Sequence, residues 1–241
     1  MSVAEFVREK LANLKFGNGF AEKASAAKAI QWIKDNRLPN SGIRANSKAK
    51  VATPEVTGYI IPTLFNYGEK DLAFDLTRWE VSVQKPDGSF AAPGSDVSYT
   101  FDTAQIARGF LAVLDDMPEV ENNLRRACDY VDGQIDKEGR VNTPSYATWK
   151  LADGTMLSEY GNLYVLPPML EVGKKLNEKR YIEAAKRGMN YFRQKKDLVE
   201  FKSELGMLSH YFGYMMEALV DLGEIELAKQ GLEQAKSLQK P

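Results

Sequence analysis

The sequence predicts an all-α protein built from a repeated helical hairpin. Apolar residues recur at three- and four-residue intervals through most of the 241-residue chain, which is the spacing of amphipathic helices. A helix, a tight turn, a second helix and a glycine-bearing loop return together about every fifty residues. Runs in which β-branched and polar residues alternate are scarce, so no strand is expected.

The clearest copy of the hairpin lies between residues 54 and 90. Its first helix is expected to end at Gly68, because glycine readily adopts the left-handed conformation that follows a helix C-terminus. A second helix is expected from about Asp71 to the Pro-Asp-Gly turn at 86–88. The loop after this turn leads into the next copy.

Three further copies are expected to turn at 116–118, at Gly173 and at Gly223, and the N-terminal segment supplies a first, degenerate copy. This gives about ten helices in about five hairpins. No segment has the composition of a linker, so residues 1–241 are expected to form a single domain. Hairpins in series either stack as an open solenoid or curl into an α/α toroid, a complete or incomplete α/α barrel with parallel inner helices.

The loop that closes the clearest copy reads QKPDGSF, with Gln84, Gly88 and Phe90 in the order Q-x-x-x-G-x-aromatic. This pattern resembles the QW-type motif of the squalene-cyclase and prenyltransferase repeat families, whose α/α toroids are similar in architecture to the six-hairpin glycosidases. Phe90 stands where those families have Trp, and Gln134 and Gly139 in the next copy are one residue farther apart. The resemblance implies a toroid in which Gln84 binds backbone groups at the helix end. It does not extend to cyclase chemistry.

The composition excludes several classes of function. The formal net charge is −1, so the chain has no basic field that would attract nucleic acid. Cys128 is the only cysteine, which excludes an intrachain disulfide and a cysteine-rich metal site; neither a metal nor another cofactor is expected. The first ten residues lack a signal-peptide core, and no apolar run reaches the roughly 20 residues of a membrane span. A soluble cytoplasmic protein is therefore expected.

Chemistry is expected where the first helix of each hairpin begins. Glu55 and His210 lie 13 residues before their turns, and Asp102 and Glu159 lie 14 residues before theirs. In a toroid these positions converge at one mouth of the barrel, where carboxylates and a histidine can exchange protons with a substrate. These four are the candidate catalytic residues. The alternative is that the acids only stabilise helix N-termini.

Side chains suited to sugar binding gather at the same mouth, because aromatic rings stack on pyranose faces while acids and amides hydrogen-bond to hydroxyls. Pro62 and Pro167–Pro168 interrupt two of the first helices, where the freed carbonyls either face a cavity or adjust the packing. The candidate substrate-binding residues are Arg44, Tyr59, Tyr99, Gln105, Trp149, Tyr160, Asn162, Tyr211 and Tyr214.

The favoured function is a carbohydrate-active enzyme of hydrolase, lyase or epimerase type that acts on a sugar, uronate or short oligosaccharide in polysaccharide metabolism. A non-catalytic helical-repeat scaffold that binds a glycan or protein partner is the alternative. A terpenoid-cyclase-like enzyme is a third reading, although the D-x-D-D motif is absent. Five hairpins do not complete a six-hairpin ring, which allows an open groove or a homodimer. The discriminating observation is whether the candidate catalytic residues share one pocket.

Overall fold

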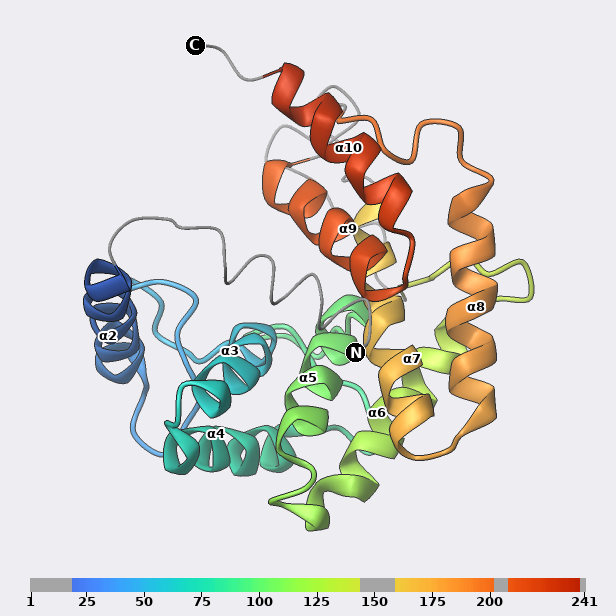
Figure 1. Ribbon diagram of the computed structural model, residues 1–241. Helices are drawn as coiled ribbons and strands as arrows, with labels where there is room; N and C mark the ends of the chain where they lie inside the picture. The colour runs from blue at the N-terminus through green and yellow to red at the C-terminus, as the bar shows by residue number, and fades with distance from the viewer. Residues whose placement is uncertain (1–18, 144–158, 202–207, 239–241) are drawn as a thin grey trace.

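The computed structural model describes residues 19–143, 159–201 and 208–238, and within them it contains nine α-helices and no strand. The prediction of an all-α protein is confirmed for this part of the chain. The expected helix near residues 3–14 and Trp149 lie outside the described residues. Two 3-10 segments, η1 (Pro118–Val120) and η3 (Glu159–Val165), accompany the α-helices. The latter are α2 (Gly19–Asn36), α3 (Pro54–Asn66), α4 (Lys70–Val83), α5 (Thr100–Val113), α6 (Glu121–Gln134), α7 (Leu166–Lys175), α8 (Lys179–Arg193), α9 (Ser209–Asp221) and α10 (Ile225–Ser237) (Figure 1).

Eight of these helices pair into hairpins that follow one another along the chain. α3 packs against α4, α5 against α6, α7 against α8 and α9 against α10. α5 also packs against α3 and α7, and α7 against α9, so the first helices of the hairpins contact one another in chain order. α2 is joined to the α4 region by the ion pairs Lys34–Glu69 and Arg37–Asp75. No described helix is long and apolar enough to cross a membrane.

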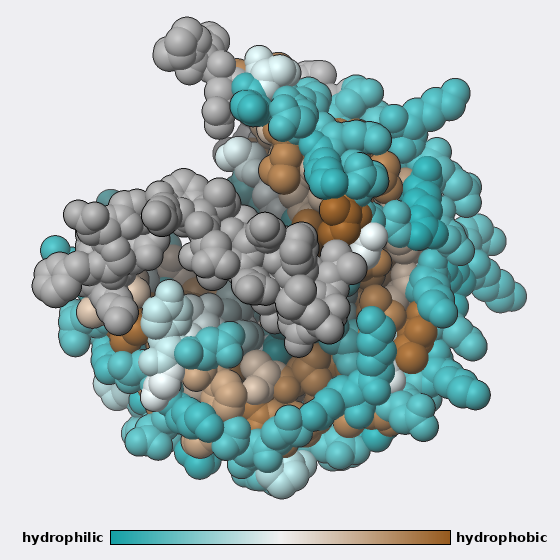
Figure 2. Space-filling view, in the orientation of Figure 1, coloured by the Kyte–Doolittle hydropathy of each residue, from teal (hydrophilic) through white to brown (hydrophobic). Residues whose placement is uncertain are grey.

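Burial distinguishes an inner helix from an outer one. α5 is buried on nearly all sides, since ten of its 14 residues are buried. α8 instead buries one stripe at helical spacing, and hydrophilic side chains dominate the outer surface on its side of the molecule (Figure 2). The buried stripe of α8 consists of Tyr181, Ala184, Ala185, Gly188, Met189 and Phe192.

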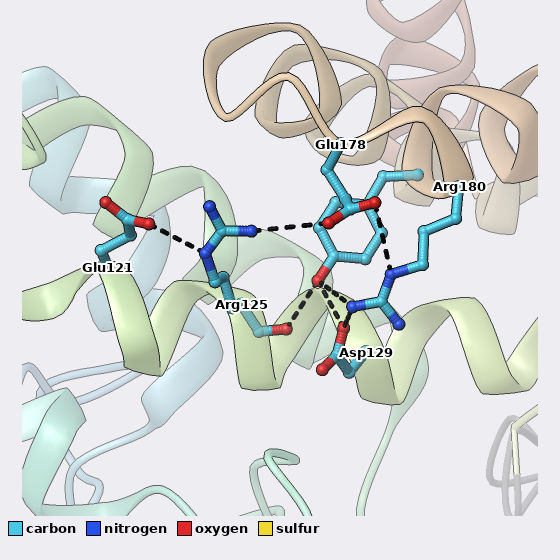
Figure 3. Close-up of polar contacts among 6 residues, drawn as sticks. Glu121, Arg125, Asp129, Glu178 and Arg180 are labelled. Carbon is cyan, nitrogen blue, oxygen red and sulfur yellow. Dashed lines mark hydrogen bonds and ion pairs between the residues drawn. The ribbon is translucent and has the colours of Figure 1, made fainter.

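A polar network fastens α8 to α6, the outer helix of the preceding hairpin. Tyr181 is fully buried; its hydroxyl donates to Asp129 and lies 3.1 Å from the carbonyl oxygen of Arg125. Asp129 also pairs with Arg180, and the guanidinium of Arg125 lies 3.6 Å from the carboxylate of Glu178 (Figure 3). The ring of Tyr181 is therefore buried between the two helices, while its hydroxyl is hydrogen-bonded at the edge of their contact, where charged groups also join them.

Three of the hairpin turns use one residue in the left-handed conformation. These residues are Gly68 (φ 82°), Asn177 (φ 52°) and Gly223 (φ 85°), so the sequence predicts two of the three turns correctly. The expected turn at Gly173 is wrong. Gly173 lies inside α7, where a Cβ would stand 2.7 Å from the side chain of Ile182. Asn177 can carry the turn because asparagine adopts the left-handed conformation more readily than most residues. Gly173 is needed instead for close packing against Ile182.

The glycine-bearing loops after α4 and α6 share one geometry. In both loops a backbone N–H donates to the carbonyl oxygen four residues later, with 3.0 Å between nitrogen and oxygen. The pairs are Lys85 with Ser89 and Asp136 with Arg140. Gly88 and Gly139 take left-handed φ values of 86° and 91°. A Cβ on either glycine would stand 2.1 or 2.2 Å from the carbonyl oxygen of Arg126 on α6 or Arg187 on α8. The repeat in the sequence is thus a repeated contact between a loop and the next outer helix.

Gln84 binds backbone groups as expected. Its amide nitrogen donates to the carbonyl oxygens of Gly88 (3.0 Å) and Asn123 (2.9 Å), and the Asn123 amide donates to its oxygen at 2.7 Å. The side chain closes its own loop and also attaches that loop to α6. In the next copy the position four residues before Gly139 holds Ile135, so Gln134 is not its equivalent.

Candidate functional site

Helices α3 and α5 cross closely enough to bring their first turns together. Pro62 has no N–H, so the carbonyl of Gly58, four residues earlier, lacks a partner within its own helix. That carbonyl oxygen lies against Gly109 of α5, 2.9 Å from the place where a Cβ would stand. A Cβ on Gly58 would stand 2.8 Å from the Cα of Ile106. The interruption at Pro62 therefore serves helix packing, and that packing positions the site.

Two threonines set the register of the crossing. Thr57 and Thr103 donate their hydroxyls to the carbonyls of Thr53 and Tyr99, four residues earlier. Each hydroxyl oxygen also accepts a backbone N–H from the preceding loop. Because the two threonines are equivalent, Glu55 corresponds to Phe101, and Asp102 lies one residue further along its helix. Glu55 and Asp102 are therefore not equivalent positions, although their similar distances from the turns suggested that they were.

Glu55 and Asp102 nevertheless line one cavity of about 300 Å³. Both side chains are partly buried. Within the described residues no Lys or Arg contributes to the electrostatic environment of either carboxylate. The other lining residues are small or aromatic: Thr53, Ala92, Pro93, Tyr99, Phe101 and Tyr211.

The two carboxyl groups differ in how strongly they hold a proton. Burial raises the pKa of Asp102 well above its ordinary value, and the charge of Glu55 raises it further. Burial also raises the pKa of Glu55, but a hydrogen bond from the Tyr59 hydroxyl to Oε1, 3.1 Å long, opposes this by stabilising the ionised form. Glu55 is therefore the first of the pair to ionise, and Asp102 keeps its proton longer.

Aromatic rings from α3, α5, η3 and α9 fill the space behind the acid pair. Tyr164 and Tyr214 stack with their centroids 4.8 Å apart, and Tyr59 and Phe101 pack against Tyr214 at 5.8 and 5.9 Å. Tyr211 meets Phe101 edge-on at 6.5 Å and reaches the cavity. Burial, followed by the charge of Glu55, raises the pKa of Tyr211 to about 12, so its hydroxyl stays protonated near neutrality.

The first part of the third described hairpin, η3 followed by α7, is shaped by its two prolines. Pro168 cannot donate to the carbonyl of Tyr164, and the side chain of Gln105 supplies the missing donor at 3.2 Å. Here too the freed carbonyl contributes to packing between helices. Asn162 in η3 is buried, and neither its amide oxygen nor its nitrogen has a hydrogen-bond partner among the described residues.

Glu159 and His210 do not line the cavity that holds the acid pair. Glu159 forms ion pairs with Arg140 (3.3 Å) and Lys195 (3.1 Å) and accepts a hydrogen bond from Tyr191. His210 is exposed at the start of α9, with its ring centroid 4.3 Å from that of Tyr211. His210 thus borders the cavity through its neighbour, whereas Glu159 is held by cations elsewhere.

The remaining candidate binding residues also fall into two groups, those that line the cavity of the acid pair and those that make contacts elsewhere. Tyr99 lines the cavity at the start of α5. Arg44 donates to the backbone of α2, at the carbonyl of Asn36 (3.3 Å), and Tyr160 hydrogen-bonds to Asp197. Phe101, which sequence reasoning missed, is signalled only by the equivalence of Thr57 and Thr103. The roles of all these residues stay predictions.

Comparison with known proteins shows a solved structure with a similar overall fold. No family model matches the chain, and no curated protein matches its sequence. Among solved structures it resembles a protein described as a novel alpha-amylase from Clostridium perfringens, with a TM-score of 0.54. The chain shares its fold with that protein. The similarity covers 88% of this chain and 86% of that one at 11% sequence identity, so it shows the fold alone.

Proposed function

We propose that the cavity at Glu55 and Asp102 binds a carbohydrate and that the protein is an enzyme that cleaves glycans by acid–base chemistry. The observation that carries the proposal is a pair of neighbouring, partly buried carboxylates in an aromatic-lined cavity, with no compensating cation among the residues that the structure describes. The fold shared with a protein described as an alpha-amylase supports the same class of substrate.

The two carboxyl groups are suited to different steps. Asp102, whose pKa is raised well above its ordinary value, would donate a proton to the oxygen of the leaving sugar. Glu55, whose ionised form is stabilised by the hydrogen bond from Tyr59, would accept a proton from water or attack the sugar carbon. Proton transfer by a positioned side chain contributes about 10² to 10⁴ in rate. Tyr99, Phe101 and Tyr211 supply rings on which a sugar can stack.

The same proposal includes the architecture. We propose that residues 1–241 form a single α/α toroid in which α3, α5, α7 and α9 belong to the inner layer. The serial contacts of the hairpins and the repeated attachment of loops to the next outer helix support it. In that arrangement the acid pair lies at the end where the inner helices begin.

The test is a glycan-cleavage assay on the full chain with maltooligosaccharides and uronate-containing oligosaccharides. Asp102→Asn is expected to lower the rate at least about a hundredfold while retaining binding, because it removes the donated proton and keeps the side-chain shape. Asp71→Asn is the matched control, since Asp71 also lies in the first turn of a helix but is exposed on α4.

Three outcomes decide between the functions. Cleavage that depends on Asp102 and Glu55 but not on Asp71 supports the enzyme. Binding of a glycan without cleavage by the unaltered protein would instead identify a helical-repeat scaffold. Cleavage that survives both Asp102→Asn and Glu55→Gln would place the chemistry elsewhere in the chain.

A further inference from the structure

A second cavity, of about 530 Å³, lies at the hairpin-turn end of the same helices. The last turns of α3, α5 and α9 line it, together with side chains from η3 and α7. Tyr59 belongs to both cavities, because its hydroxyl donates to Glu55 while its side chain forms part of the second wall. The two cavities therefore adjoin through the aromatic rings but have different polar groups.

Arg108 is the central donor of this cavity. Its guanidinium carbon lies 4.3 Å from the centroid of the Tyr164 ring. Its Nη1 atom is 3.2 Å from the carboxylate of Glu217 and 3.7 Å from that of Asp221. Nε and Nη2 are buried, and no acceptor in the described part of the chain is hydrogen-bonded to either atom. Unmet buried donors are unfavourable, so a small turn of the guanidinium toward a ligand oxygen would be stabilising.

The same wall has more acceptors than donors. Glu171, Glu217 and Asp221 carry three formal negative charges against the single positive charge of Arg108. Among the ion pairs of the described residues, Arg108 reaches Glu217 and Asp221 but not Glu171. This negative excess would repel an anion, and the positively charged guanidinium of Arg108 would repel a cation. A hydroxyl group suits both partners, because it donates to a carboxylate and accepts from an arginine.

We propose that this cavity is a second binding site, specific for an uncharged sugar or polyol. Its volume is within the ordinary range for small-molecule sites, about 300 to 1,000 Å³. Phe65 and Tyr59 provide apolar faces, and Asn66 adds an amide at the rim. The proposal does not depend on the chemistry of the acid pair, since it rests on Arg108 and the acids of α7 and α9.

Three sugars that differ mainly in charge test it: glucose, glucosamine and glucuronate. Each is titrated into the full-length ¹⁵N-labelled protein while amide signals are followed. Asn66 and Ala112 report on the second cavity, and Tyr99 and Asp102 report on the acid pair. We expect glucose to shift the signals of Asn66 and Ala112 and to bind at least about tenfold more tightly than glucuronate.

Two variants with a matched control complete the experiment. Thr63 is exposed and lines the cavity, so Thr63→Trp should fill it and abolish the glucose shifts. Glu171→Gln should weaken glucose binding about tenfold, through loss of one hydrogen bond to a charged group. Glu119→Gln, an exposed acid of η1 outside the cavity, should change nothing.

The results separate this site from the proposed function. Asp102→Asn should leave the glucose shifts at Asn66 and Ala112 unchanged, even if glycan cleavage is lost or was never present. Tighter binding of glucosamine than of glucose would overturn the proposal in favour of a cation site. Unaltered glucose binding in both Thr63→Trp and Glu171→Gln, or no shift at either reporter, would also overturn it.

Discussion

Gly58 of α3 and Gly109 of α5 meet without an intervening side chain: the carbonyl oxygen of Gly58 lies 2.9 Å from the position that a Cβ on Gly109 would occupy. The contact depends on Pro62, which leaves that carbonyl without a partner in its own helix. It sets how closely the two helices approach. The distance between Glu55 and Asp102, on the first turns of the same helices, follows from it.

Gly109→Ala is expected to destabilise the protein by about 1–3 kcal/mol, because the new methyl group meets backbone that can yield only if the helices separate. The higher helix propensity of alanine offsets at most about 1 kcal/mol of this. Urea unfolding measures the difference. Gly133→Ala on α6 is the control: in the described structure, nothing beyond the adjoining residues and backbone of its own helix lies within 4 Å of its Cβ position, so the same substitution should stabilise. Equal effects of the two would show that the crossing is not tight.

The hairpins were predictable from the sequence because each depends on local signals. Helical spacing marks α3 and α4, and the glycines at 68 and 223 end their helices as expected. Gly173 misled because a glycine can serve packing as well as a turn, and only Ile182 across the hairpin distinguishes the two uses. Asn177 carries the turn without a glycine.

The proximity of Glu55 and Asp102 was predictable from the order of the hairpins, whereas their roles stay predictions. Glu55 and Asp102 belong to neighbouring helices, so any serial packing of hairpins brings them near each other. The ion pairs of Glu159 could not be predicted, since Lys195 lies far along the chain in sequence. The offset of one residue between α3 and α5 also depends on tertiary contacts, the hydrogen bonds that Thr57 and Thr103 make to the preceding loops.

The loop glycines predict a second pair of stability effects. Gly88→Ala and Gly139→Ala each combine a left-handed backbone with a Cβ about 2 Å from a carbonyl oxygen of the next outer helix. Gly68→Ala has the left-handed backbone alone, with no atom within 4 Å of its Cβ position. Conformational strain costs about 1–2 kcal/mol at all three sites. The steric contact should add about 1–3 kcal/mol at Gly88 and Gly139 only. Thermal unfolding that ranks all three alike would argue against the docked loops.

Glu80 predicts a dependence of stability on pH. The side chain is fully buried, and neither oxygen has a hydrogen-bond partner in residues 19–143, 159–201 and 208–238. Burial raises its pKa well above the ordinary value. Above the ordinary pKa the unfolded chain releases this proton while the folded protein retains it. Stability then falls by about 1.4 kcal/mol per pH unit up to the folded-state pKa.

Glu80→Gln removes this dependence, so its stability relative to the unaltered protein should increase as the pH rises above about 5. Urea unfolding at several pH values measures the difference. The comparison isolates Glu80, because Asp102 and Glu55 contribute equally to both proteins. A difference that stays constant with pH would mean that Glu80 titrates normally.

Glu55 and Tyr59 predict opposite shifts within the acid pair. Glu55→Gln should lower the pKa of Asp102 by removing the neighbouring charge, but the pKa should stay above its ordinary value because burial is the larger cause. Tyr59→Phe should raise the pKa of Glu55 further, since it removes a hydrogen bond that favours the ionised form. Carboxyl ¹³C titration by NMR measures both values.

In the proposed mechanism the order of ionisation assigns Asp102 as the acid and Glu55 as the base, so these shifts also predict the pH profile of any cleavage. The rate should rise as Glu55 ionises and fall as Asp102 loses its proton. In Tyr59→Phe the rising limb should move to higher pH, because Glu55 then ionises later. A profile in which Tyr59→Phe lowers the rate equally at every pH would indicate that Tyr59 only supports the packing of α3 against α9.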